Sequence, residues 1–407
     1  MKFCSRPNDL MRNALLFSVL LIFQLKGFCQ LARQDKFSTF GIIARDSIEK
    51  TWGCAIATDN LGIGQYGVFE IEPEIGVIVS IAYTKPDYPI KGIKMLEQGY
   101  SLKKTIDSLL SIDESPQYRQ IAMIDKNGKT LGYTGNLIMS YTYAGSIEGD
   151  NFIVFGNSFM NDQVLSVMAS AFRDSKGKLY ERLAKALISA QNAGGQRSGK
   201  MSTALCVKKA GEHGFNEVDV RVDYSLRPFD DLQKLIDKKK GIEYLLKSRE
   251  QSSKDSSLFY LNKSVELMEG WTLMYTELSK EFYKLKRPDL AMKVLKLGID
   301  KDKLFRNCLP WNYFLIGYKP YDKEISKMKF NIHDWLEALN SLIETKEFIK
   351  AEKTGKDNLS KFPDSSHLHL LVGKALEGQD KITEAKIYFK KAMELDKDNL
   401  EAVEKSK

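Results

Sequence analysis

The hydrophobic pattern of the chain changes at Pro228, and this change limits the folds that the chain can adopt. Before Pro228, short apolar runs typical of strands are mixed with amphipathic helical segments. After it, strand-like runs disappear, lysine becomes more frequent, and apolar residues recur at helical spacing as far as the C-terminus. The sequence therefore predicts an α+β region followed by an all-α region.

The composition is that of a globular protein. The 407 residues are 43% hydrophobic and 28% charged, and at roughly 150 residues per domain they suffice for two or three domains. The net charge of +8 is modest, and acidic residues are interleaved with basic ones, so we expect a solvated surface and no nucleic-acid partner. Five cysteines without a C-x-x-C pair exclude a zinc ribbon, a thioredoxin-type site and a disulfide-dense scaffold.

The start of the chain resembles a secretory signal peptide. Three basic residues precede its apolar run: Lys2, Arg6 and Arg12. The run itself, residues 14–25, suits a signal peptide and is shorter than the roughly 20 residues that cross a bilayer. Gly27 and Cys29 are the small residues expected before a cut, which makes Gln30 the first mature residue. We therefore expect an exported protein, periplasmic or secreted, with no membrane span in its mature chain; a lipid-anchored Cys29 is the weaker alternative.

Three cysteines remain in the mature chain: Cys54, Cys206 and Cys308. An odd number leaves at least one thiol unpaired within the chain. Cys54 and Cys206 both lie in strand-like runs, so a disulfide between them is an alternative if those strands are neighbours. Three separate buried thiols are the simpler expectation.

The first region is expected to form a layered sheet structure. Its strand-like runs cover 39–44, 53–58, 76–83, 119–124, 129–134, 152–155, 202–208 and 218–223. Its helical periodicities cover 90–110, 164–172 and 179–191. Because strands, a helix, strands, two helices and strands follow one another, we expect helices on the outer faces rather than an alternating βαβ fold.

Residues 258–402 carry a helix-pair repeat near 34 residues long. The clearest copy has small and aromatic residues at spacings of 12, 4 and 3: Gly373, Ala385, Phe389 and Ala392. Ala351 precedes Ala385 by 34 residues and marks another copy, and a third, weaker copy contains Ala291. Small residues let paired helices approach closely, and aromatic residues fill the remaining holes. The region resembles the tetratricopeptide repeat (TPR) family, which implies a protein or peptide partner on the concave face of the repeats.

The expected boundaries follow from these patterns. They are a signal peptide at 1–29, a short segment at 30–38, an α+β domain at 39–227, a helix and linker at 228–257, and helical repeats at 258–402. The stretch 303–331 does not fit the repeat, and its aromatic cluster is expected to be core. We expect either this stretch or a helix over 232–249 to cap the stack of repeats.

Familiar catalytic motifs are absent from the sequence. It contains no G-x-x-x-x-G-K-[ST], G-x-S-x-G or H-E-x-x-H motif, and no Ser-His-Asp order that supports a triad. Residues 62–64 (Gly-Ile-Gly) lack the third glycine and the helix of a dinucleotide site, so we expect a turn there. The four histidines lie in a late loop or in the repeats, and we expect neither a metal ion nor another cofactor.

Short matches spread over residues 39–223 resemble one family. They begin with Thr-Phe-Gly-Ile-Ile-Ala-Arg-Asp at 39–46 and end with Asp-Val-Arg-Val-Asp at 219–223. Between these lie Gly53–Thr58, Arg119-Gln120, Thr134-Gly135, Ala144-Gly145, Gly156-Asn157 and Ala193–Gly195. No single match is specific, but their order and spacing resemble the family labelled domain of unknown function 1028, whose members look like N-terminal-nucleophile (Ntn) hydrolases. The resemblance implies an αββα sandwich.

The resemblance also implies a chemistry for Thr39. In an Ntn hydrolase the first residue of the processed chain attacks a carbonyl with its side chain, and its free α-amine takes the proton. Such an amine has an unperturbed pKa of about 7.7–8.0, so it is partly neutral at working pH. Asn157 is a candidate donor to the oxyanion, and Ser202, after the glycine-rich loop, is a second pocket candidate. Charge partners, or structural salt-bridge residues instead, are Arg45, Asp46, Arg119 and Asp125.

Several features weigh against activity. Signal cleavage leaves Gln30–Ser38 ahead of Thr39, whose nitrogen is then an amide and no base, so a second cut such as self-processing is needed. Residues 194–202 read Gly-Gly-Gln-Arg-Ser-Gly-Lys-Met-Ser where relatives read Gly-Gly-Asp-x-Arg-Gly-x-Gln-Ser, and Ser80-Ile81 stand where many relatives have Thr-Gln.

Two interpretations therefore stay open. One is an exported Ntn amidohydrolase that acts on an amide or peptide-like substrate through Thr39 after processing. The other is a catalytically inactive Ntn-fold binding or scaffold protein that uses its TPR repeats for protein–protein interaction. They differ in whether the mature chain begins at Thr39.

Overall fold

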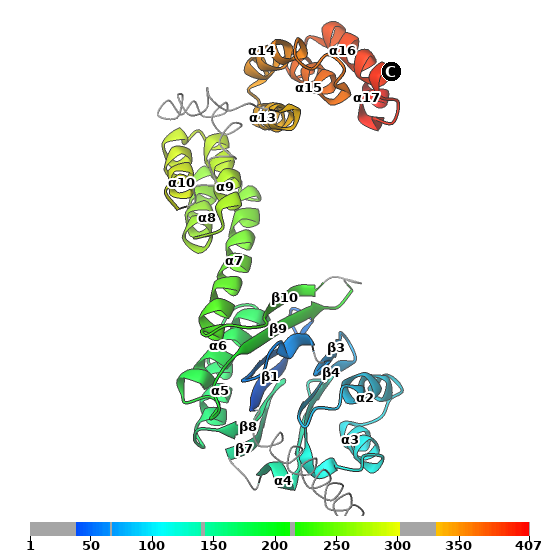
Figure 1. Ribbon diagram of the computed structural model, residues 1–407, viewed down its shortest axis with the longest axis vertical. Helices are drawn as coiled ribbons and strands as arrows, with labels where there is room; N and C mark the ends of the chain where they lie inside the picture. The colour runs from blue at the N-terminus through cyan, green and yellow to red at the C-terminus, as the bar shows by residue number, and fades with distance from the viewer. Residues whose placement is uncertain (1–37, 66, 140–142, 212–215, 302–330, 407) are drawn as a thin grey trace, which may run out of the picture. The chain divides into compact units, whose positions relative to one another are not determined.

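The computed structural model describes residues 38–65, 67–139, 143–211, 216–301 and 331–406. The expected signal peptide, Cys308 and the aromatic cluster of 303–331 lie outside this part of the chain. The chain divides into two compact units, one ending at Ile236 and one beginning at Asp237. Figure 1 shows strands and helices in the first unit and helices in the second. The division falls within the helix α7 (Pro228–Arg249).

The first unit contains two antiparallel sheets. The six-stranded sheet has the order β10-β9-β2-β1-β8-β7. Its strands are β1 (Thr39–Asp46), β2 (Thr51–Thr58), β7 (Tyr143–Gly149), β8 (Phe152–Phe159), β9 (Ser202–Lys209) and β10 (Asn216–Val222). The four-stranded sheet has the order β3-β4-β5-β6. Its strands are β3 (Phe69–Glu72), β4 (Gly76–Ala82), β5 (Arg119–Asp125) and β6 (Thr130–Thr134).

Helices of the first unit connect these strands. The longer ones are α2 (Asp87–Glu97), α3 (Leu102–Ser111), α5 (Val164–Arg173) and α6 (Leu179–Asn192). The short ones are α4 (Asn136–Met139) and the 3-10 turns η1 (Ile63–Gln65) and η2 (Pro116–Tyr118). The order of strands and helices agrees with the sequence pattern.

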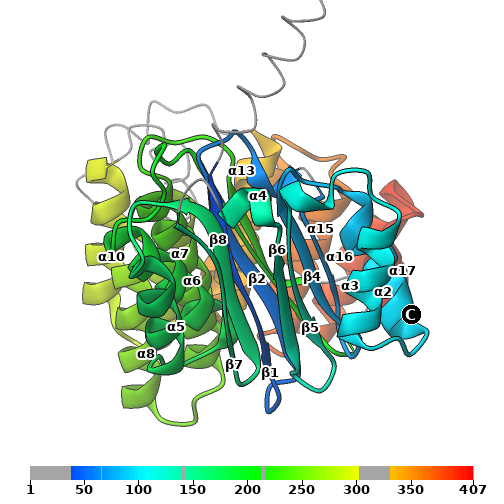
Figure 2. The ribbon, with the colours of Figure 1, turned by 90° about the horizontal axis from the view of Figure 1, so that it is seen from below.

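Alternation along β1 assigns its side chains to two different cores. Phe40 and Ile42 pack with residues of α5 and α6, whereas Ile43 lies in a core between the sheets, with Val79 of β4 and Ala122 of β5. A third core joins the outer face of the four-stranded sheet to α2 and α3. The unit therefore has four layers, with α5 and α6 on one side of the paired sheets and α2 and α3 on the other (Figure 2).

Some elements differ from the sequence pattern. The periodicity over 90–110 is divided between α2 and α3, because Gly99 adopts a left-handed backbone (φ +85°) and the Ser101 side chain caps α3 by accepting from Lys104 N–H. The strands β3 and β7 have no counterpart in the sequence pattern, since few of their residues are buried. The turn expected at 62–64 is present: Gly62 has φ +62° and is followed by η1.

The second unit consists of helices that pack in consecutive pairs. After α7 they are α8 (Lys254–Leu267), α9 (Thr272–Lys284), α10 (Pro288–Lys301), α13 (Ile332–Glu344), α14 (Phe348–Leu359), α15 (Ser366–Glu377), α16 (Ile382–Leu395) and α17 (Leu400–Lys405). Helix α8 begins at Lys254 with Ser253 as its cap, so the end of the helix-and-linker segment expected at 228–257 is helical. No helix within the described ranges is both long enough and apolar enough to cross a membrane.

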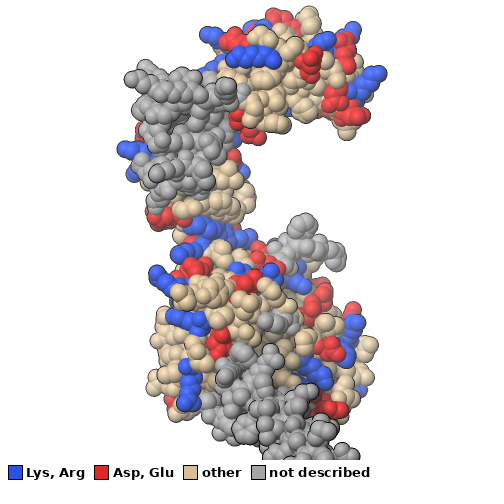
Figure 3. Space-filling view, viewed as in Figure 1, with Lys and Arg blue, Asp and Glu red and all other residues tan. Residues whose placement is uncertain are grey.

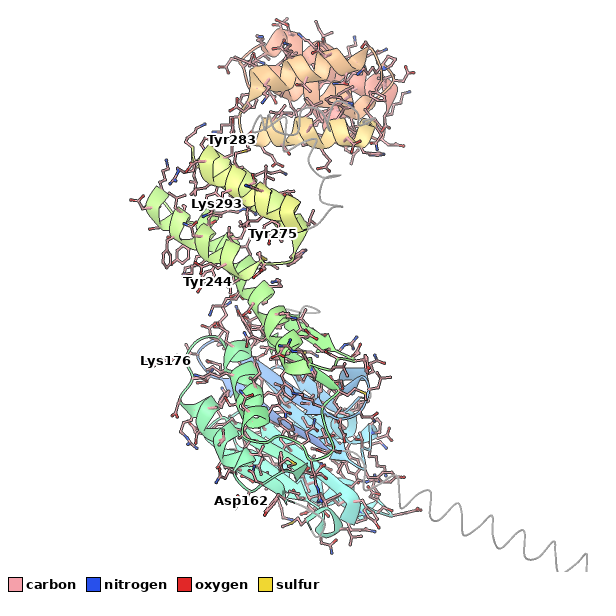
Figure 4. The ribbon with its side chains drawn as sticks, turned by 60° about the vertical axis from the view of Figure 1, so that its left-hand side comes forward. Asp162, Lys176, Tyr244, Tyr275, Tyr283 and Lys293 are labelled. Carbon is pink, nitrogen blue, oxygen red and sulfur yellow. The ribbon has the colours of Figure 1, made fainter. Side chains whose placement is uncertain are left out.

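Aromatic residues mark the packing of the first helices in this unit. Tyr244 of α7 stacks on Tyr260 of α8, with ring centroids 6.0 Å apart. Tyr275 of α9 is buried in the core that α8, α9 and α10 share, and Figure 4 labels Tyr244 and Tyr275 on their helices. Further along, α13–α17 form two more cores, and Tyr283 of α9 packs against the first of them.

Candidate functional site

Thr39 lies at one end of the space between the two sheets. It is paired in register with Thr58 of β2, and Thr58 is paired with Ser202 of β9. Directly paired residues point to the same face of a sheet. That face carries the core between the sheets, to which Ile43 and Ile56 belong. The register therefore places three hydroxyl side chains in a row that faces the second sheet.

The polarity of the hydrogen bonds at Thr39 follows from Thr58. The Thr58 hydroxyl donates to the carbonyl oxygen of Ser38 at 2.9 Å, and the two threonine hydroxyl oxygens lie 3.0 Å apart. A hydroxyl has one proton to donate, so Thr39 Oγ1 must donate to Thr58 Oγ1. The Thr39 side chain is thus buried, 6% exposed, with its proton directed at a neighbouring oxygen.

The side-chain amides of Gln120 and Asn157 are hydrogen-bonded in sequence, and together they determine which Asn157 atom faces the Thr39 nitrogen. Gln120 Nε2 lies 2.8 Å from the carbonyl oxygen of Gly156 and 3.1 Å from that of Gly145. Carbonyls only accept, so this end of Gln120 is the donor and its Oε1 accepts from Asn157 Nδ2 at 3.0 Å. Asn157 Oδ1 then accepts from Thr39 N–H at 3.3 Å. Asn157, the candidate oxyanion donor, thus contacts Thr39 as an acceptor.

Ser38, the residue before Thr39, is fully buried. Its backbone N–H donates to Asp59 Oδ1 at 2.8 Å, and its hydroxyl donates to Gln196 Oε1 at 3.1 Å. Its carbonyl oxygen accepts from Thr58 and also from the Asp59 backbone N–H at 3.3 Å. In this form the Thr39 nitrogen is an amide, so it is not a base.

The glycine-rich loop closes the same end of the unit. Arg197 N–H donates to the Ser158 carbonyl at 2.9 Å, which holds the loop against β8. Gln196 is 4% exposed, and its Nε2 has no hydrogen-bond partner among the described residues. Burial raises the pKa of Asp59, although hydrogen bonds from Ser198 and from the Ser38 backbone partly offset this.

The Ser202 side chain forms hydrogen bonds with the loop after β2 and does not contact Thr39. Its hydroxyl donates to the Asn60 carbonyl at 2.7 Å and accepts from Ile63 N–H at 3.1 Å. Both functions of the hydroxyl are therefore used in holding residues 60–63. Ser202 shares a face with Thr39 but acts here as a positioning group.

The charged candidates lie elsewhere. Arg45 and Asp46 end β1, about 20 Å from Thr39 at a rise of about 3.3 Å per residue. Arg45 stacks over the Trp52 ring at 5.4 Å, and Asp46 pairs with Arg182 at 3.0 Å. Asp125 closes the hairpin turn by accepting from the N–H groups of residues 127 and 129. These three side chains have structural partners.

Arg119 precedes Gln120 but occupies the opposite face of β5. Its guanidinium donates to both carboxylate oxygens of Asp113, at 2.7 and 3.0 Å, and to the Tyr83 carbonyl. These bonds from Arg119, together with one from the Tyr88 hydroxyl, hold the pKa of Asp113 well below its usual range. The pair is buried, so Arg119 is a structural residue of the α2–α3 side.

The two described cysteines are opposite each other in register on β2 and β9. Cys54 and Cys206 are both buried free thiols. Burial raises the pKa of Cys54 well above its usual range and that of Cys206 to about 12. Their strands are neighbours, as a disulfide requires, yet the structure contains two separate thiols.

Other surfaces of the described residues show fewer features of a catalytic or binding site. No group of three or more His, Cys, Asp or Glu side chains is placed to hold a metal ion among the residues that the structure describes. A shallow pocket in the second unit is lined by Arg249, Glu281 and Lys284; Glu281 pairs with Arg249 at 2.8 Å and with Lys284 at 3.3 Å. On the face drawn in Figure 3, basic and acidic side chains are interspersed.

Sequence reasoning missed four residues of this site: Thr58, Asp59, Gln120 and Gln196. Thr58 had a usable signal, because the short hairpin between β1 and β2 pairs residues whose numbers sum to 97. Gln120 lies in one of the family matches and Gln196 in the loop that departs from the family, but no local pattern places either beside Thr39, since one lies in the other sheet and the other in a loop.

Comparisons with known proteins point to one family for the first unit. No curated protein matches the chain. A crystal structure of protein SPO2555 from Silicibacter pomeroyi, which carries the DUF1028 family model, is similar at 28% sequence identity; the match covers 49% of this chain and 84% of that one, with a TM-score of 0.45. Residues 39–232 match the model described as "Family of unknown function (DUF1028)". This match confirms, for residues 39–232, the resemblance found in the sequence.

Proposed function

We propose that the first unit is the precursor of an Ntn-type amidohydrolase in which Thr39 becomes the nucleophile once the Ser38–Thr39 peptide bond is cut. The observation that carries this proposal is the convergence of buried polar groups on both functional atoms of Thr39. Thr58 binds its hydroxyl and Asn157 binds its nitrogen. Buried polar groups cost free energy unless they are paired, so a strand end that only closed a core would carry apolar side chains.

The layer order supports the same proposal. Two antiparallel sheets packed face to face, with helices outside both, agree with the αββα sandwich of Ntn hydrolases. Thr39 begins a central strand of one sheet, at one end of the space between the sheets. In this position a new N-terminus would face Asn157 Oδ1, which already accepts from the Thr39 nitrogen.

The chemistry then proceeds in two balanced steps. The free α-amine of Thr39 takes the proton from Oγ1, which attacks the carbonyl carbon of the amide; the carbon–nitrogen bond breaks, and the leaving amine receives that proton. Water then attacks the resulting ester, gives a proton to the α-amine, and releases the acid while Oγ1 regains its proton. Asn157 Oδ1 holds the amine throughout, as an acceptor.

Oxyanion stabilisation is better served by Thr58 and Asp59 than by Asn157. Asn157 Nδ2 already donates to Gln120. By contrast, the Thr58 hydroxyl and the Asp59 backbone N–H both donate to the Ser38 carbonyl, the group that Thr39 Oγ1 would attack in self-processing. Donors aimed at that oxygen are what an acyl transfer requires, and losing one typically costs about 3–4 kcal/mol in the barrier.

A second function, protein binding by the helical unit, is supported by its packing. A Cβ atom added at Gly373 would lie 2.4 Å from the Phe389 ring, so only glycine lets α15 approach α16 this closely. Ala385 and Ala392 are buried on the same helix pair. This packing supports a TPR-like repeat with a protein or peptide partner, and we propose that the chain acts outside the cytoplasm, in the periplasm or as a secreted protein.

The first test is the N-terminus of the mature protein, by intact mass and terminal sequencing. We expect the chain to begin at Thr39, and the Thr39→Ala variant to keep the residues that precede it. Thr51→Val, which changes a buried threonine at the other end of β2, should be cut normally. A mature chain that retains Ser38 would rule out the amine base and leave the binding function.

A further inference from the structure

Ser38 occupies a polar subsite whose contacts describe the residue that fits it. Asp59 accepts from its nitrogen, Gln196 accepts from its hydroxyl, and Thr58 donates to its carbonyl. The Ser38 side chain is fully buried, so a larger one would have to displace its neighbours. Cutting before Thr39 removes Ser38 and leaves these groups facing the new N-terminus.

We propose that this residue-38 subsite, formed by Thr58, Asp59 and Gln196, binds the acyl residue of the substrate and selects α-aminoacyl amides with a free amine and a small hydroxylated side chain, such as L-seryl amides. This rests on the proposed function, because the subsite is free only after the cut. In processing, Thr39 Oγ1 attacks the Ser38 carbonyl carbon; the bond from that carbon to the Thr39 nitrogen breaks, the nitrogen receives the hydroxyl proton, and water then hydrolyses the ester. In turnover the same oxygen attacks the substrate carbonyl. The donors that hold the first carbonyl therefore suit the second.

The preference for a free amine follows from Asp59. Its carboxylate is half-buried and makes no ion pair with any residue that the structure describes. Its hydrogen bonds come from Ser38 N–H and the Ser198 hydroxyl, and the first of these is lost with Ser38. A substrate ammonium group would restore that hydrogen bond and also supply the missing positive charge, whereas an acylated nitrogen would restore the hydrogen bond alone.

The preference for a hydroxyl follows from Gln196. One atom of its amide faces the Ser38 hydroxyl, and the other is buried without a partner among the described residues. Turning the amide by half a turn would exchange these atoms and still leave one unmatched. After the cut, an apolar acyl side chain would leave both ends of this buried amide unmatched, which costs binding free energy. A hydroxyl satisfies one end.

The test uses the full chain from Thr39 onward, released from an N-terminal tag by an added protease so that self-processing is not required. Binding of L-serinamide is compared by calorimetry with that of N-acetyl-L-serinamide, L-alaninamide and L-leucinamide. Hydrolysis of the same four amides is followed by ammonia release. We expect L-serinamide to bind at least about tenfold more tightly than each of the others.

Variants assign each preference to its residue. Asp59→Asn keeps a side-chain acceptor but removes the charge, so the advantage of L-serinamide over its N-acetyl form should disappear. Gln196→Met should remove the advantage over L-alaninamide and leave the N-acetyl comparison intact. Asp46→Asn, at the far end of β1, is the matched control and should change neither ratio.

The outcomes separate the two proposals. Hydrolysis of all four amides at similar rates, with equal binding, would overturn the subsite and keep Thr39 as nucleophile. Selective binding of L-serinamide without ammonia release would overturn the hydrolase and support the subsite. Neither binding nor hydrolysis would overturn both.

Discussion

Two neighbouring residues of β5 belong to buried polar clusters of opposite kinds. Arg119 lies on the outer face, where its bonds to Asp113 and Tyr83 cancel the charges and leave the cluster saturated. Gln120 lies on the inner face, in a cluster of amides and hydroxyls around Thr39. Beside that cluster lie Asp59 and Gln196; among the described residues, the Asp59 carboxylate has no cation and Gln196 Nε2 has no hydrogen-bond partner. A saturated cluster holds a fold together, while unmatched buried groups suit a ligand.

The largest expected effect is on stability, at the saturated cluster. Arg119→Met removes the bidentate cation of the Asp113 carboxylate, which is 2% exposed, and leaves it with Lys85 Nζ at 3.7 Å. Breaking a buried pair in this way should lower the free energy of unfolding by about 3–5 kcal/mol, measured by urea denaturation. The folded fraction should still be cut before Thr39, because the Arg119 cluster does not contact that residue.

Two controls sharpen this prediction. Lys103→Met breaks an exposed pair with Asp107 on α3 and should change the stability little. Replacing both partners, as Arg119→Met with Asp113→Leu, should recover much of the loss, because the buried carboxylate is gone and Lys85, one-third exposed, is solvated. A double variant as unstable as the single one would mean that Arg119 acts through packing instead.

Much of this fold follows from local pattern. The β1–β2 pair, the β5–β6 hairpin and the helices α5 and α6 could be predicted because apolar periodicity and turn residues are local signals. The break at Gly99 and the strands β3 and β7 could not be predicted in this way. Strand β3 has four residues with one buried, and β7 has none that is fully buried, so neither carries a clear hydrophobic period.

The site was less predictable than the fold. Thr39, Asn157 and Ser202 were expected from the family resemblance, and the structure places all three on one face of the six-stranded sheet. Of Asn157 and Ser202, only Asn157 contacts Thr39, because β8 neighbours β1 whereas β2 separates Ser202 from Thr39. Gln120 comes from the opposite sheet, and no sequence period reports that pairing.

The next largest effect should come from Gln120. Gln120→Met deprives the Gly145 and Gly156 carbonyls of their donor and frees the Asn157 amide to turn. We expect a loss of about 1–3 kcal/mol in the free energy of unfolding and a slower cut before Thr39, followed by mass spectrometry over time. Thr134→Val removes only one acceptor of Gln120 and should affect the cut far less. Equal rates for wild type and Gln120→Met would show that the amide chain does not orient Thr39.

Substitutions of Thr58 should change processing before Thr39 far more than they change the free energy of unfolding. Thr58→Val removes the donor to the Ser38 carbonyl and the acceptor for Thr39, at a cost of about 1 kcal/mol per hydrogen bond. The cut before Thr39 should nevertheless be lost or strongly slowed, because the oxyanion loses a donor. Thr58→Ser retains the hydroxyl and should be cut at nearly the rate of wild type. If both variants were cut equally well, the Thr58 hydroxyl would have no part in processing.

The smallest expected effect is on the pH dependence of stability, which should have opposite signs for the carboxylates of Asp59 and Asp113. Burial raises the pKa of Asp59, so the folded state favours its protonated form, and its contribution to stability is lost as pH rises from about 4 through the raised value. Asp113 has a lowered pKa, so its contribution is present above about pH 4 and is lost as pH falls below it. Asp59→Asn should therefore stabilise the precursor relative to wild type increasingly above pH 4, while Asp113→Asn should reduce the stability there and have less effect in stronger acid. Urea denaturation as a function of pH measures both slopes. If both variants changed the stability with pH in the same direction, the pKa of Asp59 would be lowered by a positive partner in the precursor, and its charge would not be available to a substrate amine.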